Sequence, residues 1–99
     1  MRLRWTRRAK EDLVEIGRYI AEDKPGAAER WVRTLIRSAR RAAELPMACR
    51  RVPELMREDV REVLVRGYRI VYRIDGKVVW IVTVFEGHRL LPRDVVETL

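Results

Sequence analysis

The segment YRIVYRIDGKVVWIVTV, residues 68–84, decides the fold because it reads as two apolar β-strands joined by a tight turn. Asp75-Gly76 lies at its centre and favours a two-residue type I′ turn, in which both central residues need positive φ. Residues 62–65, of which the last three are apolar, predict a further strand, and Arg66-Gly67 predicts the turn that follows it. Residues 62–85 therefore predict a three-stranded antiparallel meander.

A strand and two helices are expected before the meander. Arg2 to Trp5 alternates between charged and apolar residues, which indicates an edge strand, and Thr6 is a good helix N-cap. Apolar residues then recur at helical spacing over residues 9–22 and again over 25–45. Residues 47–59 are expected to be a loop. The sequence predicts one α+β domain, residues 1–99: an N-terminal edge strand, an α-hairpin and the meander, forming one curved sheet packed on two helices.

The composition favours an acidic partner. There are 22 basic and 15 acidic residues, for a net charge of +7, and all but three of the basic residues are arginine. Arginine binds phosphate and carboxylate equally well, so this charge does not distinguish a nucleic acid from an acidic protein segment. With single residues Cys49 and His88, neither a disulfide framework nor a zinc site is expected, and no other cofactor is indicated.

The first residues are charged, and no apolar run approaches the ~20 residues of a membrane span. These features predict a cytoplasmic protein.

The predicted hairpin register gives the sheet two different faces. With Asp75-Gly76 at the turn, one face pairs large apolar residues and should pack on the helices: Tyr72 with Val79, Ile70 with Ile81, and Tyr68 with Thr83. The other face pairs Arg69 with Val82, Val71 with Trp80, and Arg73 with Val78. Monomers rarely expose apolar area bordered by fixed charge, so we predict an interaction surface on this second face. The alternative is that residues 90–99 cover Trp80, with the arginines extending over it.

An ordered set of residues along nearly the whole chain resembles the RelE/ParE superfamily of bacterial toxins, and most closely its ParE branch. The set is Trp5, Ala9, Asp12-Leu13, Ile16, Tyr19-Ile20-Ala21, Pro25, Ala27-Ala28, Leu45-Pro46, Arg61-Glu62, the run from Tyr68 to Arg73, Gly87 and Arg89. The resemblance implies a curved antiparallel sheet packed on an α-hairpin, in agreement with the fold predicted above. It also implies the toxin of a type II toxin–antitoxin module, with no cofactor. ParE-like members poison DNA gyrase, whereas RelE-like members cut messenger RNA at the ribosome.

Antitoxins of this superfamily neutralise the toxin in a heteromeric complex by docking a disordered, acidic, amphipathic tail. The second sheet face has the complementary character. We therefore expect a ParD-like antitoxin to bind Arg69, Val71, Arg73, Val78, Trp80 and Val82, with the arginines pairing with its carboxylates.

The alternative function is RNA cleavage, which needs an acid, a base and cations around the phosphate. RelE-like nucleases resemble one another in carrying lysines and arginines across the sheet and an aromatic residue or histidine near the C-terminus. This chain has no lysine just before the sheet and no tyrosine after Tyr72. The remaining catalytic candidates are His88 as acid or base, with Arg61, Arg69 and Arg89 on the phosphate. A third alternative is a basic nucleic-acid-binding domain that is not a toxin, which would have only Trp80 for stacking.

Overall fold

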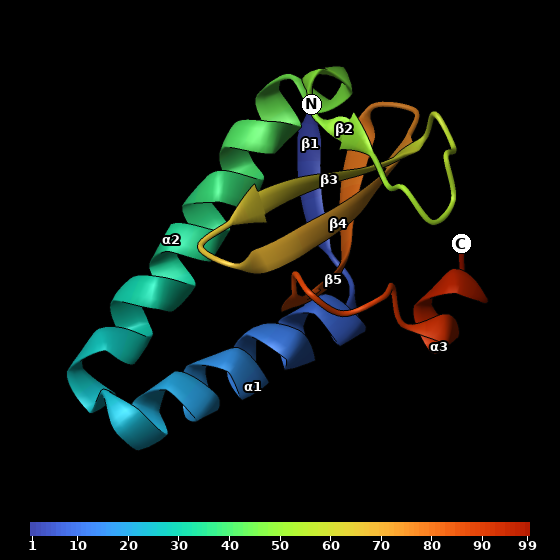
Figure 1. Cartoon of the computed structure of the whole chain (residues 1–99). Helices are drawn as coiled ribbons and strands as arrows, with labels where there is room; N and C mark the ends of the chain where they lie inside the picture. The colour runs from blue at the N-terminus through green and yellow to red at the C-terminus, as the bar shows by residue number, and fades with distance from the viewer.

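The N-terminal residues form the predicted edge strand and helix. The computed structural model describes residues 1–99. The chain begins with strand β1 (Arg2–Trp5), which is followed by helix α1 (Arg7–Asp23) (Figure 1). Thr6 caps α1, because its hydroxyl accepts a hydrogen bond from the Ala9 amide at 3.1 Å. Helix α2 (Pro25–Glu44) begins at a proline, as expected for a position whose N–H would have no helical partner. No helix of the chain has both the length and the apolar character needed to cross a membrane.

The sheet has five strands. A short strand β2 (Arg50–Arg51) is followed by the meander of β3 (Val60–Val65), β4 (Tyr68–Asp75) and β5 (Val78–Glu86), and the strand order is β1-β5-β4-β3-β2. β1 runs parallel to β5, and the other pairs are antiparallel. The prediction that residues 47–59 are only a loop is wrong in part, because they contain β2 and the end of a single 3-10 turn, Pro46–Ala48. The α+β fold with two helices on one sheet is confirmed.

The helices cover one face of the sheet, and the C-terminal part of the chain covers part of the other (Figure 1). The main core lies between α1, α2 and the sheet and includes Leu35, Ile70, Tyr72 and Ile81, each fully buried. A second core on the opposite face includes Val52, Val60, Val71, Phe85 and Val95. Val95 belongs to a short helix, α3 (Arg93–Val96), which lies beyond the last strand.

The turn predicted at Arg66-Gly67 is confirmed, and the second meander turn differs from the prediction in position and type. Arg66 and Gly67 both have positive φ, 48° and 84°, so the type I′ geometry lies here. In the β4–β5 hairpin Asp75 pairs with Val78, so the central residues are Gly76 and Lys77 rather than Asp75-Gly76. Only Gly76 has positive φ there, 59°, which is the pattern of a type II′ turn with glycine first.

The observed hairpin register differs accordingly. Tyr72 pairs with Ile81, and a bulge then leaves Val82 unpaired, so that Val71 pairs with Thr83 and Arg69 with Phe85. The bulge is fixed from outside the hairpin. The Asp12 carboxylate accepts hydrogen bonds from the Thr83 hydroxyl at 2.6 Å and the Val84 amide at 3.0 Å. All six predicted pairs are therefore wrong: on the outer face Arg69 with Val82, Val71 with Trp80, and Arg73 with Val78, and on the helix-covered face Tyr72 with Val79, Ile70 with Ile81, and Tyr68 with Thr83. The assignment of Ile70 and Ile81 to the helix-covered face is confirmed.

Candidate functional site

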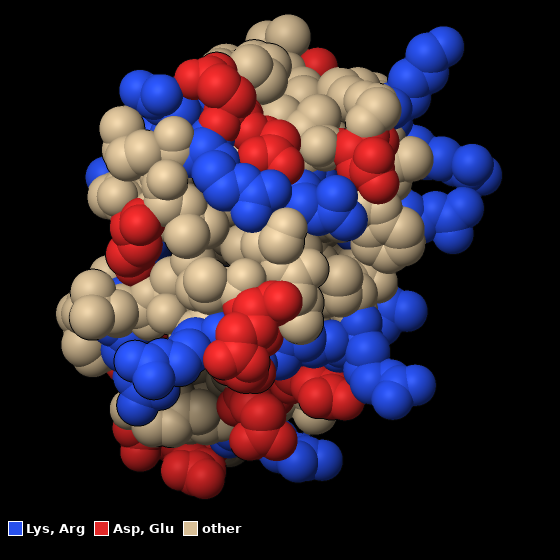
Figure 2. All heavy atoms as spheres, turned by 90° about the vertical axis from the view of Figure 1, so that its right-hand side faces the viewer, with Lys and Arg blue, Asp and Glu red and all other residues tan.

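The outer face of the sheet, which points away from α1 and α2, carries the six residues expected to bind an antitoxin. We divide it into a covered half, around Arg69, Val71 and Val82, and an open half, around Arg73, Val78 and Trp80. Figure 2 views the molecule from the side of α3 and the β2–β3 loop, and shows a central area without charged residues between two bands of mixed charged side chains. The two halves differ in what lies over them.

In the covered half the expected exposure is wrong. Val71 is fully buried and Val82 is 7% exposed, because both belong to the second core together with residues of the β2–β3 loop and the tail. The tail therefore covers this half of the sheet, whereas the alternative had placed it over Trp80, which it borders with Val95 and Leu99. Trp80 lies at the margin of this core and is only partly buried.

Arg69 is enclosed in a buried ion-pair network. Its Nε donates to Glu62 at 2.7 Å, and its two terminal nitrogens bind both oxygens of Glu54 at 2.9 and 2.6 Å. One of these nitrogens also donates to the Arg89 carbonyl at 3.0 Å, and Glu54 accepts a hydrogen bond from the Leu91 amide at 2.7 Å. The guanidinium lies over the Phe85 ring, 4.8 Å from its centroid. Arg69 thus ties the β2–β3 loop and the tail to the sheet.

The electrostatics agree with this geometry. The hydrogen bonds from Arg69 lower the pKa of Glu54 to about 2, against the opposing effect of burial. The Glu62 side chain is 0% exposed, and its second oxygen accepts a hydrogen bond from Arg50 at 2.7 Å. An arginine in the middle of β4 therefore has a structural explanation, since it neutralises two carboxylates within the chain. Whether an antitoxin contacts Arg69 stays a prediction.

In the open half Arg73, Val78 and Trp80 are each only partly buried. Trp80 pairs with Arg73 on one side and with Arg4 of β1 on the other, while Val78 pairs with Arg2. The only carboxylate paired with Arg73 is the exposed Asp75, at 3.6 Å. A cavity of about 580 Å³ lies beside Trp80 and Arg73, with α3 and the C-terminal residues as its other wall.

The residues of the nuclease alternative come together only in part: Arg69 lies against the Arg89 carbonyl, and Arg61 lies apart from both. Arg61 lies on the helix-covered side, where it pairs with Tyr72 and donates to the Met47 and Cys49 carbonyls at 3.2 and 2.9 Å. Arg69 belongs to the network on the outer face, and His88 is exposed in the turn after β5, 3.7 Å from Glu86. Since Arg61 and Arg69 lie on opposite faces of the sheet, they cannot bind one phosphate. No group of three metal-ligating side chains is present either.

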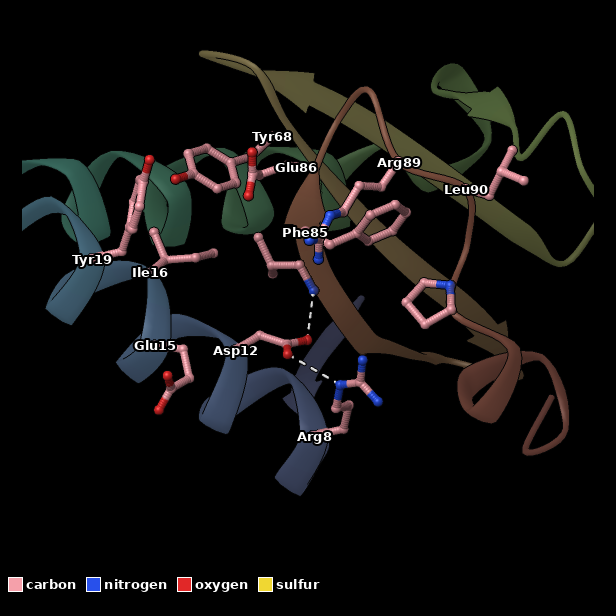
Figure 3. Close-up of a pocket in the computed structure, with 12 residues that line it drawn as sticks. Arg8, Asp12, Glu15, Ile16, Tyr19, Tyr68, Phe85, Glu86, Arg89 and Leu90 are labelled. Carbon is pink, nitrogen blue, oxygen red and sulfur yellow. Dashed lines mark hydrogen bonds and ion pairs between the residues drawn. The ribbon is translucent and has the colours of Figure 1, made fainter.

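A second cavity, of about 480 Å³, lies between α1 and the end of β5 (Figure 3). Tyr19 and Glu15 line it from α1, and Phe85, Glu86 and Arg89 line it from the opposite side. Burial, with the nearby charge of Glu86, raises the pKa of Tyr68 beside it. Acidic and basic side chains both line this cavity, so its charge does not favour one class of partner.

The sequence prediction missed two groups of residues. Arg2 and Arg4 could have been found, because their alternation with Leu3 and Trp5 places both arginines on one face of the strand. No pattern in the sequence indicated a role for Glu54. It lies in an irregular segment, and only the folded chain brings it to Arg69.

A family model described as "ParE toxin of type II toxin-antitoxin system, parDE" matches residues 3–91. A relative from Sinorhizobium fredii, named "Putative toxin Y4kP", is 38% identical over 94 residues, covering 93% of this chain and 94% of the relative. The solved structure "Chromosomal ParDE TA system from P. aeruginosa" shares the fold with a TM-score of 0.78 at 22% identity, covering 87% of this chain and 95% of that chain.

Proposed function

The chain belongs to the ParE family of toxins of type II toxin–antitoxin systems, and we propose that it inhibits DNA gyrase and is neutralised by a ParD-like antitoxin. The match of the family model to residues 3–91 carries this proposal, since it spans α1, α2 and all of the sheet except the first residue of β1. The separation of Arg61 from Arg69 supports gyrase inhibition over RNA cleavage, because the cations of a nuclease site would have to surround one phosphate.

The test is a supercoiling assay with purified gyrase and a parallel assay of messenger RNA on translating ribosomes. We expect the chain to inhibit supercoiling with accumulation of cleaved DNA, and to leave the messenger RNA intact. His88→Ala is the control, because His88 is exposed and pairs only with Glu86. Ribosome-dependent cleavage that is lost in His88→Ala would show instead a messenger RNA endoribonuclease.

For the antitoxin contact, the accessible part of the predicted surface is the open half. Arg73 is available to a carboxylate of an acidic tail, and Val78 and Trp80 are available to its apolar residues. A ligand that binds only the folded toxin raises its melting temperature. We therefore expect the antitoxin, taken as the product of an adjacent gene with an acidic tail, to raise the Tm of the wild type more than that of Arg73→Ala. An equal rise in both proteins would place the contact elsewhere.

A further inference from the structure

Three side chains of the open half form a row across three strands. Arg4 on β1 pairs with Trp80 on β5, and Trp80 pairs with Arg73 on β4. Paired residues point to the same face, and neighbouring strands lie ~4.8 Å apart. The row therefore places one arginine on each side of a partly exposed tryptophan.

The cations around this row are largely free of internal partners. Arg2, Arg4 and Arg7 are exposed and take part in none of the ion pairs of the chain. Two acidic residues, Glu11 and Asp94, line the adjacent cavity, and Asp94 already pairs with Arg8. This contrasts with Arg69, whose charge is fully used within the chain. The open half thus has an excess of positive charge available to a ligand.

The adjacent cavity gives a ligand room beside the indole. At about 580 Å³ it falls within the ~300–1,000 Å³ typical of sites that take small molecules or single groups. Trp80 and Arg73 form one wall, and Val95 and Leu99 contribute apolar surface to the other. A flat group stacked on Trp80 would therefore be held between apolar side chains with a cation beside it.

We propose that the row of Arg4, Trp80 and Arg73 binds single-stranded nucleic acid, with one base stacked on Trp80 and the flanking phosphates on the two arginines. Sheet faces that bind single strands use this combination of a stacking aromatic and neighbouring cations. The direction of the row favours a nucleic acid over a peptide that extends the sheet by pairing with its edge strand. A peptide added to the sheet runs along the edge strand β1 and would contact only Arg2 and Arg4, whereas a strand that crosses the sheet contacts all three members of the row.

This site is separate from the proposed inhibition of gyrase, which the supercoiling assay tests independently. It shares Arg73 and Trp80 with the proposed antitoxin contact, so we expect nucleic acid to bind the toxin only when it is free of antitoxin.

The first test measures binding of labelled 12-nucleotide probes by fluorescence anisotropy: single-stranded DNA, single-stranded RNA, and the DNA duplex. We expect both single strands to bind more tightly than the duplex, because bases within a duplex cannot stack on Trp80. Trp80→Leu keeps an apolar side chain against the second core but removes the aromatic face, and should weaken single-strand binding ~10-fold or more. Trp80→Phe keeps an aromatic ring and should stay within ~3-fold of the wild type.

The second test uses salt dependence. Each phosphate contact on a single strand contributes ~0.7 to the slope of log K against log salt concentration. Arg4→Gln and Arg73→Gln should each reduce that slope by ~0.7, and Trp80→Leu should leave it unchanged. Arg37→Gln is the matched control, because it removes the same charge from an exposed position of α2, on the helix-covered side of the sheet.

Three results would overturn the proposal. The first is no single-strand binding by a wild type that is folded by circular dichroism. The second is equal slope changes for Arg37→Gln and for the two row variants, which would show only general attraction to a basic protein. The third is single-strand binding that Arg4→Gln and Trp80→Leu both leave unchanged, which would place the strand elsewhere on the chain. Arg4 is exposed on an edge strand, so Arg4→Gln tests the site even where Trp80 variants fold poorly.

Discussion

Replacing Arg69 by methionine should strongly destabilise the chain. The Arg69 side chain is 6% exposed and neutralises Glu62, which is 0% exposed, and Glu54, which is 23% exposed. After the substitution, Glu62 would keep only Arg50, whose side chain is 53% exposed. Removing one partner of a buried ion pair costs ~3–5 kcal/mol, because a charge is left in a medium that solvates it poorly. For a domain of this size the expected fall in Tm is at least ~12 °C.

The assay is urea unfolding at pH 7, followed by tryptophan fluorescence, for Arg69→Met and for Arg50→Met. Arg50→Met removes the half-exposed partner of the same Glu62, so its cost should stay near ~1 kcal/mol. The triple variant Arg69→Met, Glu62→Leu, Glu54→Leu replaces the network by apolar groups, and should be more stable than Arg69→Met alone. Amide exchange adds a local readout, since loss of the network should speed exchange of the Leu91 amide, which Glu54 holds.

The explanation would be refuted if Arg69→Met cost less than ~1 kcal/mol with Leu91 exchange unchanged. That outcome would mean that the second core alone holds the tail and the β2–β3 loop.

Three further variants test contacts of Glu54, Asp12 and Ile70. The pKa of Glu54 is about 2 in the folded chain against an ordinary 4.5, so Glu54 should contribute stability above pH ~4.5 that is lost as the pH falls toward 2. In Glu54→Gln the free energy of unfolding should change less across that pH range. An unchanged dependence on acid pH in this variant would contradict the pairing with Arg69. Asp12→Ala should cost ~1–3 kcal/mol in urea unfolding, because the amide of Val84 at the bulge loses its acceptor, whereas the exposed control Glu15→Ala should cost under ~0.5 kcal/mol. Ile70→Ala should cost ~2–5 kcal/mol, since its side chain is fully buried under the helices, and a cost below ~1 kcal/mol would mean that the sheet faces are misassigned.

The order of the elements and the helix-covered face of the sheet could be predicted from the sequence because they depend on local patterns. The spacing of apolar residues over 9–22 and 25–45 predicted α1 and α2, and alternation predicted β1, β3, β4 and β5. Pro25 and Thr6 are signals that act within one turn of helix, and both have the predicted role. For the site, alternation placed Arg69, Arg73 and Trp80 on the outer face of the sheet, which the structure confirms.

Only the tertiary structure decided which parts of that face are covered and how the hairpin pairs. The bulge at Val82 depends on Thr6 and Asp12, which lie some seventy residues earlier in the chain and meet β5 only in the folded state. Glu54 reaches Arg69 across an irregular loop, and Val95 reaches the second core from a four-residue helix. Periodicity reports which residues share a face, because side-chain direction is fixed by the local backbone. Periodicity does not indicate which distant segment will lie over that face, since that depends on the shape and charge of the whole folded chain.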